Sequence, residues 1–60
     1  MYTVLLVDDE PVVLNTERRI IERKIPGFEV IGEAFSVKRA LEIYDRQKPH
    51  VVLTDIKMPV

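Results

Sequence analysis

Two short apolar runs constrain the fold of this chain most. Neither alternates with polar residues, and each is followed directly by an aspartate. Residues 4–7 (VLLV) are followed by Asp8 and Asp9, and residues 51–54 (VVLT) are followed by Asp55. Such runs are typical of strands that are covered on both faces of a parallel sheet. If the two strands are parallel neighbours, their carboxyl ends meet at one edge, where open α/β sheets bind ligands. The sequence therefore predicts that three carboxylates lie together.

Three carboxylates at one sheet edge repel one another unless a cation lies among them or one of them takes up a proton. Oxygen ligands of this kind are those that hard cations prefer. A carboxylate in such a place can also act as a nucleophile. We therefore expect a hard-cation site and a candidate nucleophile among Asp8, Asp9 and Asp55.

The rest of the chain predicts a strand–helix–strand–helix–strand order. Pro11 suits the first turn of a helix, with Asp9 or Glu10 before it as a cap, and Ser36 is a plausible N-cap for a second helix. Connections of this length favour right-handed parallel crossovers. The predicted strands cover residues 3–7, 28–32 and 50–54. A helix over about 11–24 joins the first strand to the second, and a helix over about 37–48 joins the second to the third.

Helical periodicity predicts which residues face the core. For the first helix these are Val13, Leu14, Ile20 and Ile21, and for the second Val37, Ala40, Leu41 and Tyr44. Glu17 falls in the middle of the first set, and we expect its carboxylate to reach the edge of that face. The charged residues around it are interpreted as a solvated helix face with weak ion pairs four residues apart.

Composition narrows the class of protein. The chain has 60 residues, no cysteine and a net charge of −1, which argue for one small domain without disulfides and against a non-specific nucleic-acid binder. The first apolar run has no basic leader, and no stretch approaches the ~20 apolar residues of a membrane span. A soluble cytoplasmic protein is expected.

Several segments together resemble the receiver domain of two-component response regulators. They are residues 4–11 (VLLVDDEP), 32–34 (GEA), 40–41 (AL) and 49–59 (PHVVLTDIKMP), so the resemblance spans the whole chain. It implies a flavodoxin-like, doubly wound parallel sheet. This chain would supply its first three strands, in the order 2-1-3, as the amino-terminal half of the domain.

The resemblance also implies roles for the acids. Asp55 is similar to the phosphoacceptor, which attacks the phosphohistidine of a sensor histidine kinase and becomes an acyl phosphate. Asp9 resembles the direct Mg²⁺ ligand, Asp8 the acid that holds the ion's waters, and Lys57 the position whose backbone carbonyl completes the protein ligands. Mg²⁺ suits such a site because it keeps several waters and bridges to phosphate oxygens.

Two residues of the family have no counterpart in these 60 residues, a Thr or Ser after a fourth strand and a Lys after a fifth. We therefore expect a signalling module rather than an enzyme, with weak Mg²⁺ binding and little activity as a half-domain. The alternative is a structural fragment that self-assembles into a homodimer through the third strand or bare sheet faces. A metal-dependent phosphatase with Asp55 as nucleophile fits less well, because such enzymes usually carry Asp-x-Asp after the first strand.

Overall fold

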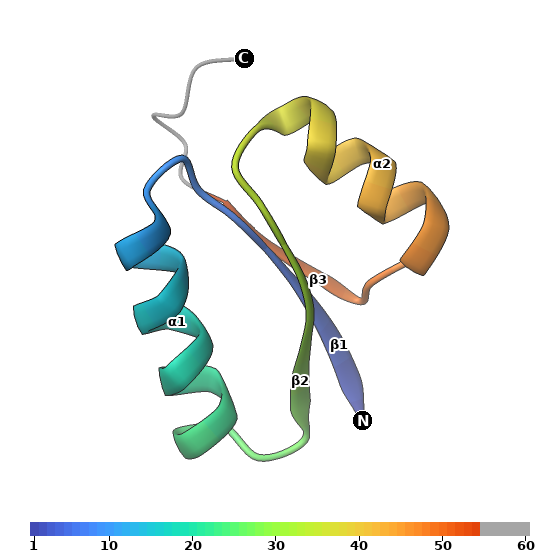
Figure 1. Cartoon of the computed structure of the whole chain (residues 1–60). Helices are drawn as coiled ribbons and strands as arrows, with labels where there is room; N and C mark the ends of the chain where they lie inside the picture. The colour runs from blue at the N-terminus through green and yellow to red at the C-terminus, as the bar shows by residue number, and fades with distance from the viewer. Residues whose placement is uncertain (55–60) are drawn as a thin grey trace.

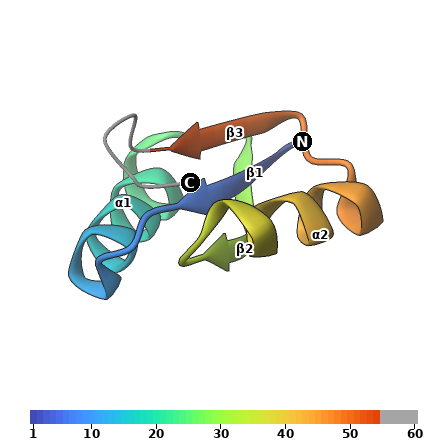
Figure 2. The same cartoon turned by 90° about the horizontal axis from the view of Figure 1, so that it is seen from above.

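The three strands form one parallel sheet in the order β2-β1-β3, with a helix on each face (Figures 1 and 2). The computed structural model describes residues 1–54. The elements are β1 (Tyr2–Val7), α1 (Pro11–Lys24), β2 (Phe28–Ala34), α2 (Val37–Gln47) and β3 (Val51–Thr54). The predicted half of a flavodoxin-like fold is confirmed, including the strand order and the positions of both helices.

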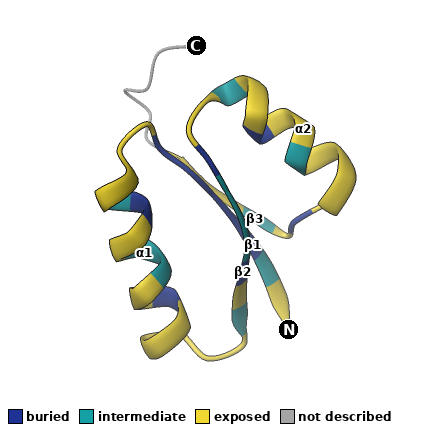
Figure 3. Ribbon diagram, viewed as in Figure 1, coloured by how far each residue is buried: buried dark blue, intermediate teal, exposed yellow. Residues whose placement is uncertain are grey.

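The central strand β1 divides the core into two clusters, because its side chains alternate between the sheet faces. Val4 and Leu6 pack with Leu14 and Ile21 of α1. On the opposite face, Leu5 and Val7 pack with Ala34 of β2 and with Ala40 and Ile43 of α2. Figure 3 shows that burial is concentrated in β1 and on the inner faces of the helices.

The second strand is longer than predicted. Gly32 does not end it, and Glu33 and Ala34 continue the pairing with β1. The register shifts between Val4 and Leu5, where β2 contributes one extra residue, so Gly32 rather than Ile31 lies opposite Leu5. Such a bulge re-aims the side chains that follow it.

Local signals explain the helix ends. Ser36 caps α2 as predicted, because its hydroxyl accepts the Arg39 N–H at 3.2 Å. Lys48 ends that helix in the left-handed region with φ of 48°, one residue before Pro49. The predicted side-chain cap of α1 is wrong, since Glu10 occupies the N-cap position without a side-chain cap hydrogen bond.

The predicted inner faces of the helices are partly wrong. Ile20 is 47% exposed on α1, and Leu41 and Tyr44 are 60% and 44% exposed on α2. On α2 the small Ala40 faces the sheet and Ile43 packs beside it, which turns Leu41 and Tyr44 outward. Glu17 is half-buried. Within residues 1–54, neither helix has the length and apolar character needed to cross a membrane.

Candidate functional site

The carboxyl ends of β1 and β3 lie side by side at one edge of the sheet. Val7 is paired with Thr54, the last residue of each strand. The N–H of Asp8 then donates to the carbonyl of Ala34 at 3.0 Å, which ties the exit of β1 to the end of β2. The chain therefore carries its first predicted site residue out of the sheet at the edge where parallel α/β sheets bind ligands.

The two acids after β1 have different environments. Asp8 is only 6% exposed, and its Oδ1 accepts the Glu10 N–H at 2.9 Å. This bond holds the carboxylate inside the short connection that leads into α1. Asp9 is exposed at the same turn and leaves its carboxylate accessible from solvent. One acid is thus fixed by the backbone, and the other is available to a ligand.

The remaining predicted site residues, Asp55 and Lys57, lie outside the described residues. Asp55 directly follows Thr54 in the sequence, as Asp8 directly follows Val7. Residues 1–54 contain no group of three or more His, Cys, Asp or Glu side chains that could hold a metal ion. In this part of the chain the site consists of Asp8 and Asp9, and the third carboxylate stays a prediction.

The donor set fits a hard divalent cation. Asp8 and Asp9 supply carboxylate oxygens, and one of the two is held rigidly. Mg²⁺ is bound in proteins through one or two carboxylates while it keeps several of its waters. Within residues 1–54 no His or Cys joins the two acids in a group that could hold a metal, and zinc sites are usually built from such ligands.

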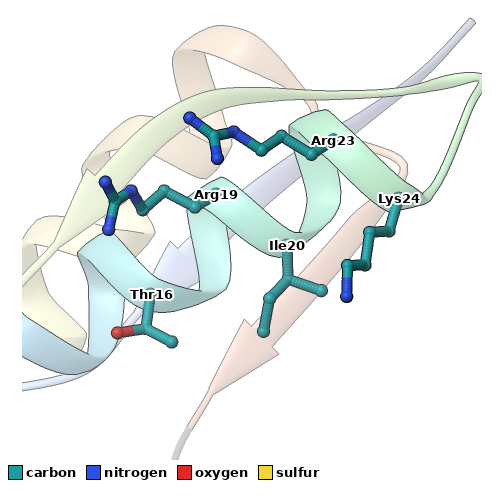
Figure 4. A pocket seen from close by; sticks show the side chains of 5 residues that line it. All are labelled: Thr16, Arg19, Ile20, Arg23 and Lys24. Carbon is teal, nitrogen blue, oxygen red and sulfur yellow. The ribbon is translucent and has the colours of Figure 1, made fainter.

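A second concave surface lies on α1 and differs in charge. It is a shallow depression of about 290 Å³ lined by Thr16, Arg19, Ile20, Arg23 and Lys24. Figure 4 shows the three basic side chains extended from the helix around Ile20. Because its charged residues are all basic, this depression is unsuited to a cation.

A contact at the opposite end of the sheet joins the start of β3 to β1. His50 is exposed and is hydrogen-bonded to Thr3, 47 residues away in the sequence. Its ring also meets the Tyr2 ring edge-on, with centroids 5.4 Å apart. The only sequence signal for this contact is that His50 stands directly before the third apolar run.

The family model of the response regulator receiver domain matches residues 4–60. The chain belongs to this family. It is 42% identical over 98% of its length to the uncharacterized transcriptional regulatory protein YesN of Bacillus subtilis, and 47% identical over 95% to protein-glutamate methylesterase/protein-glutamine glutaminase 3 of Hahella chejuensis. The receiver chain spans 16% of the length of each of these relatives.

A solved structure supports the same assignment. RcsB from Salmonella enterica serovar Typhimurium, bound to promoter rprA in the presence of the phosphomimetic BeF₃⁻, superimposes with a TM-score of 0.89 at 30% identity. The alignment covers 98% of this chain and 29% of that one. The family match and the structural superposition therefore agree that this chain has the receiver fold of two-component response regulators. The output activities named for the relatives belong to those longer proteins.

Proposed function

We propose that this receiver chain is the phosphoacceptor part of a cytoplasmic response regulator and that Asp55 accepts the phosphoryl group. The observation that carries the proposal is the parallel pairing of Val7 with Thr54, after which each strand continues directly into an aspartate. Similarity to RcsB, whose structure is described in the presence of a phosphomimetic, supports phosphoryl chemistry in this fold.

In the proposed reaction, a carboxylate oxygen of Asp55 attacks the phosphorus of a phosphohistidine on a sensor histidine kinase. The new O–P bond forms as the P–N bond breaks, and the leaving imidazole takes the electron pair and then a proton. The product is an acyl phosphate on Asp55. The chain thus acts as an acceptor in a transfer, and not as an enzyme with turnover of its own.

Mg²⁺ would neutralise charge on the transferring group when bound. Asp9 and Asp55 would be direct ligands, Asp8 would hold the ion's waters, and the Lys57 carbonyl would complete the protein ligands. The hydrogen bond from the Glu10 N–H to Asp8 supports this division, because it occupies one oxygen of Asp8 and none of Asp9. The exposed Asp9 is free to adjust to the ion.

Residues 1–54 form three strands and no fourth or fifth, from whose ends the family's Thr or Ser and Lys would reach the phosphoryl group. We therefore expect weak Mg²⁺ binding and slow or undetectable phosphorylation for this chain by itself. Mg²⁺ affinity and the extent of phosphorylation both depend on Asp55. Measuring each of them therefore tests the same site in two independent ways.

The test titrates the chain with Mg²⁺ by NMR and then adds a small phosphodonor, with mass spectrometry as the readout. We expect Asp9→Asn and Asp55→Asn to abolish the Mg²⁺ response, while the matched control Glu10→Gln retains it. Any phosphoryl adduct should be on Asp55. Mg²⁺ binding that survives both substitutions would refute the site, and efficient modification of the unaltered chain would refute its low competence.

A homodimer is the second candidate, and the outer side of β3 favours it. Within residues 1–54 this strand pairs only with β1. Val52 and Leu53 are 42% and 39% exposed on opposite faces. Leu53 also lines an apolar groove of about 260 Å³ with Ile20 of α1 and with Ile25, which follows that helix. An exposed apolar strand edge is a template for pairing with another chain. A two-fold axis would join β3 to its copy in antiparallel fashion.

Sedimentation velocity tests this association. We expect the unaltered chain to sediment as a dimer at micromolar concentration, and Leu53→Lys to shift it to monomer by placing a charge in the contact. The matched control is Leu41→Lys, at a 60% exposed leucine on α2, which should leave the dimer intact. A folded monomer for the unaltered chain would rule the dimer out.

A further inference from the structure

The start of β3 is fastened to β1 by His50, through both its backbone and its side chain. The His50 N–H donates to the carbonyl oxygen of Thr3 at 3.0 Å and to its Oγ1 at 3.2 Å. In return, His50 Nδ1 accepts the Thr3 backbone N–H at 3.0 Å and lies 3.1 Å from Thr3 Oγ1. These four contacts between one pair of residues form what we call the His50–Thr3 latch.

Such a latch is needed because the strand itself specifies its register weakly. β3 has four residues, the first three of them apolar, and in the described part of the chain it pairs with β1 alone. A register is well specified where a slip would move polar side chains into the core. In β3 a slip by one residue exchanges Val52 and Leu53 between two apolar faces, so side-chain burial gives little discrimination.

The register of β3 decides where its last residue, Thr54, lies along β1. A slip by one residue would move the strand end by about 3.3 Å relative to β1, and by two residues about 6.6 Å. Ligands of Mg²⁺ must lie within about 2.1 Å of the ion in near-octahedral geometry. Either slip would therefore separate Asp55 from a site that includes Asp8 and Asp9.

We propose that His50 is a positioning residue for the phosphoacceptor: its neutral imidazole, latched to Thr3, sets the register of β3 on β1 and so the place of Asp55. The part of this inference that concerns Asp55 rests on the proposed function. The latch itself rests on the contacts of His50 alone.

The latch requires one protonation state of the ring. Nδ1 accepts the Thr3 N–H, so the ring proton must be on Nε2. An imidazolium carries a proton on both nitrogens and would present a donor to a donor.

The ring of His50 also contacts an aromatic side chain of β1. Tyr2 meets it edge-on, and Tyr2 in turn contacts the ring of Phe28 of β2. Among residues 1–54 no acidic side chain forms an ion pair with His50.

The test measures hydrogen exchange of the backbone amides of β3 and Thr3 in the whole chain. We expect His50→Ala to lower their protection by roughly fivefold, the equivalent of one net hydrogen bond. His50→Asn should keep full protection, because its Oδ1 can accept the Thr3 N–H. His50→Gln, with its acceptor one bond further out, should behave like His50→Ala.

Equal protection in His50→Ala and the unaltered chain would overturn the latch. So would the same loss of protection in His50→Asn as in His50→Ala. The consequence for Asp55 is read separately from Mg²⁺ titrations, in which His50→Ala should weaken binding and His50→Asn should not. If Asp55→Asn leaves Mg²⁺ binding unchanged, the proposed function fails while the exchange result still decides the latch. If only His50→Ala leaves it unchanged, the link between latch and site is refuted.

Discussion

Gly32 and Ile43 approach so closely that a side chain at position 32 would meet the α2 helix. A Cβ on Gly32 would lie 3.3 Å from Cγ2 of Ile43 and 3.4 Å from Cδ1 of Leu5. The bulge in β2 places this glycine under α2 and opposite Leu5. The absence of a side chain therefore sets how closely α2 packs on the sheet.

We expect Gly32→Val to destabilise the chain by about 1–3 kcal/mol, the usual cost of overpacking a core. Chemical denaturation gives the free energy of unfolding. In the double variant Gly32→Val/Ile43→Ala the added methyl groups occupy the space that Ile43 vacates, so the two changes should cost less than their sum. Strict additivity would contradict the contact.

Leu14 and Leu41 offer a matched pair of helix leucines, the first 1% and the second 60% exposed. Leu14→Ala should cost about 2–5 kcal/mol, because it leaves a cavity beside Leu6 and Ile21. Leu41→Ala should stay within about 0.5 kcal/mol, as surface substitutions usually do. Equal costs in thermal or chemical unfolding would show that α2 packs through the face first predicted from sequence.

Ser36 should stabilise α2 through its cap. Ser36→Ala leaves the Arg39 N–H without its side-chain acceptor and is expected to cost about 1 kcal/mol, whereas Ser36→Gly should cost only a few tenths. Circular dichroism during denaturation measures both. Full stability in Ser36→Ala would indicate that the hydroxyl contact with Arg39 is unimportant.

Arg18 links α1 to β2 through Glu33, with its Nε 3.0 Å from Glu33 Oε2. About a third of each side chain is exposed, so we expect a coupling of at most about 1 kcal/mol in a double-mutant cycle with Arg18→Gln and Glu33→Gln. The coupling should shrink in about 1 M salt, where screening acts over roughly 3 Å. A coupling that is unchanged by salt would argue against an electrostatic origin.

The sequence by itself determined the elements whose signals are local. Pro11 and Ser36 mark the helix starts, and Pro49 marks the end of the second helix. The apolar runs mark β1 and β3, the first and last elements of the chain. The neighbouring carboxyl ends of β1 and β3 also follow from these runs and from the family resemblance. The roles of Asp55 and Lys57 stay predictions.

Only the tertiary structure decided which faces of the helices are buried and how the strands align. Ala40 faces the sheet as predicted, but Ile43 lies beside it in place of Leu41 and Tyr44, because α2 packs over a glycine that a bulge moves into place. The contact between His50 and Thr3 joins residues 47 apart. Periodicity and capping report on neighbours within a turn or a strand. Rotation of a helix and register of a strand depend on side chains that are distant in sequence, and these meet only when the chain folds.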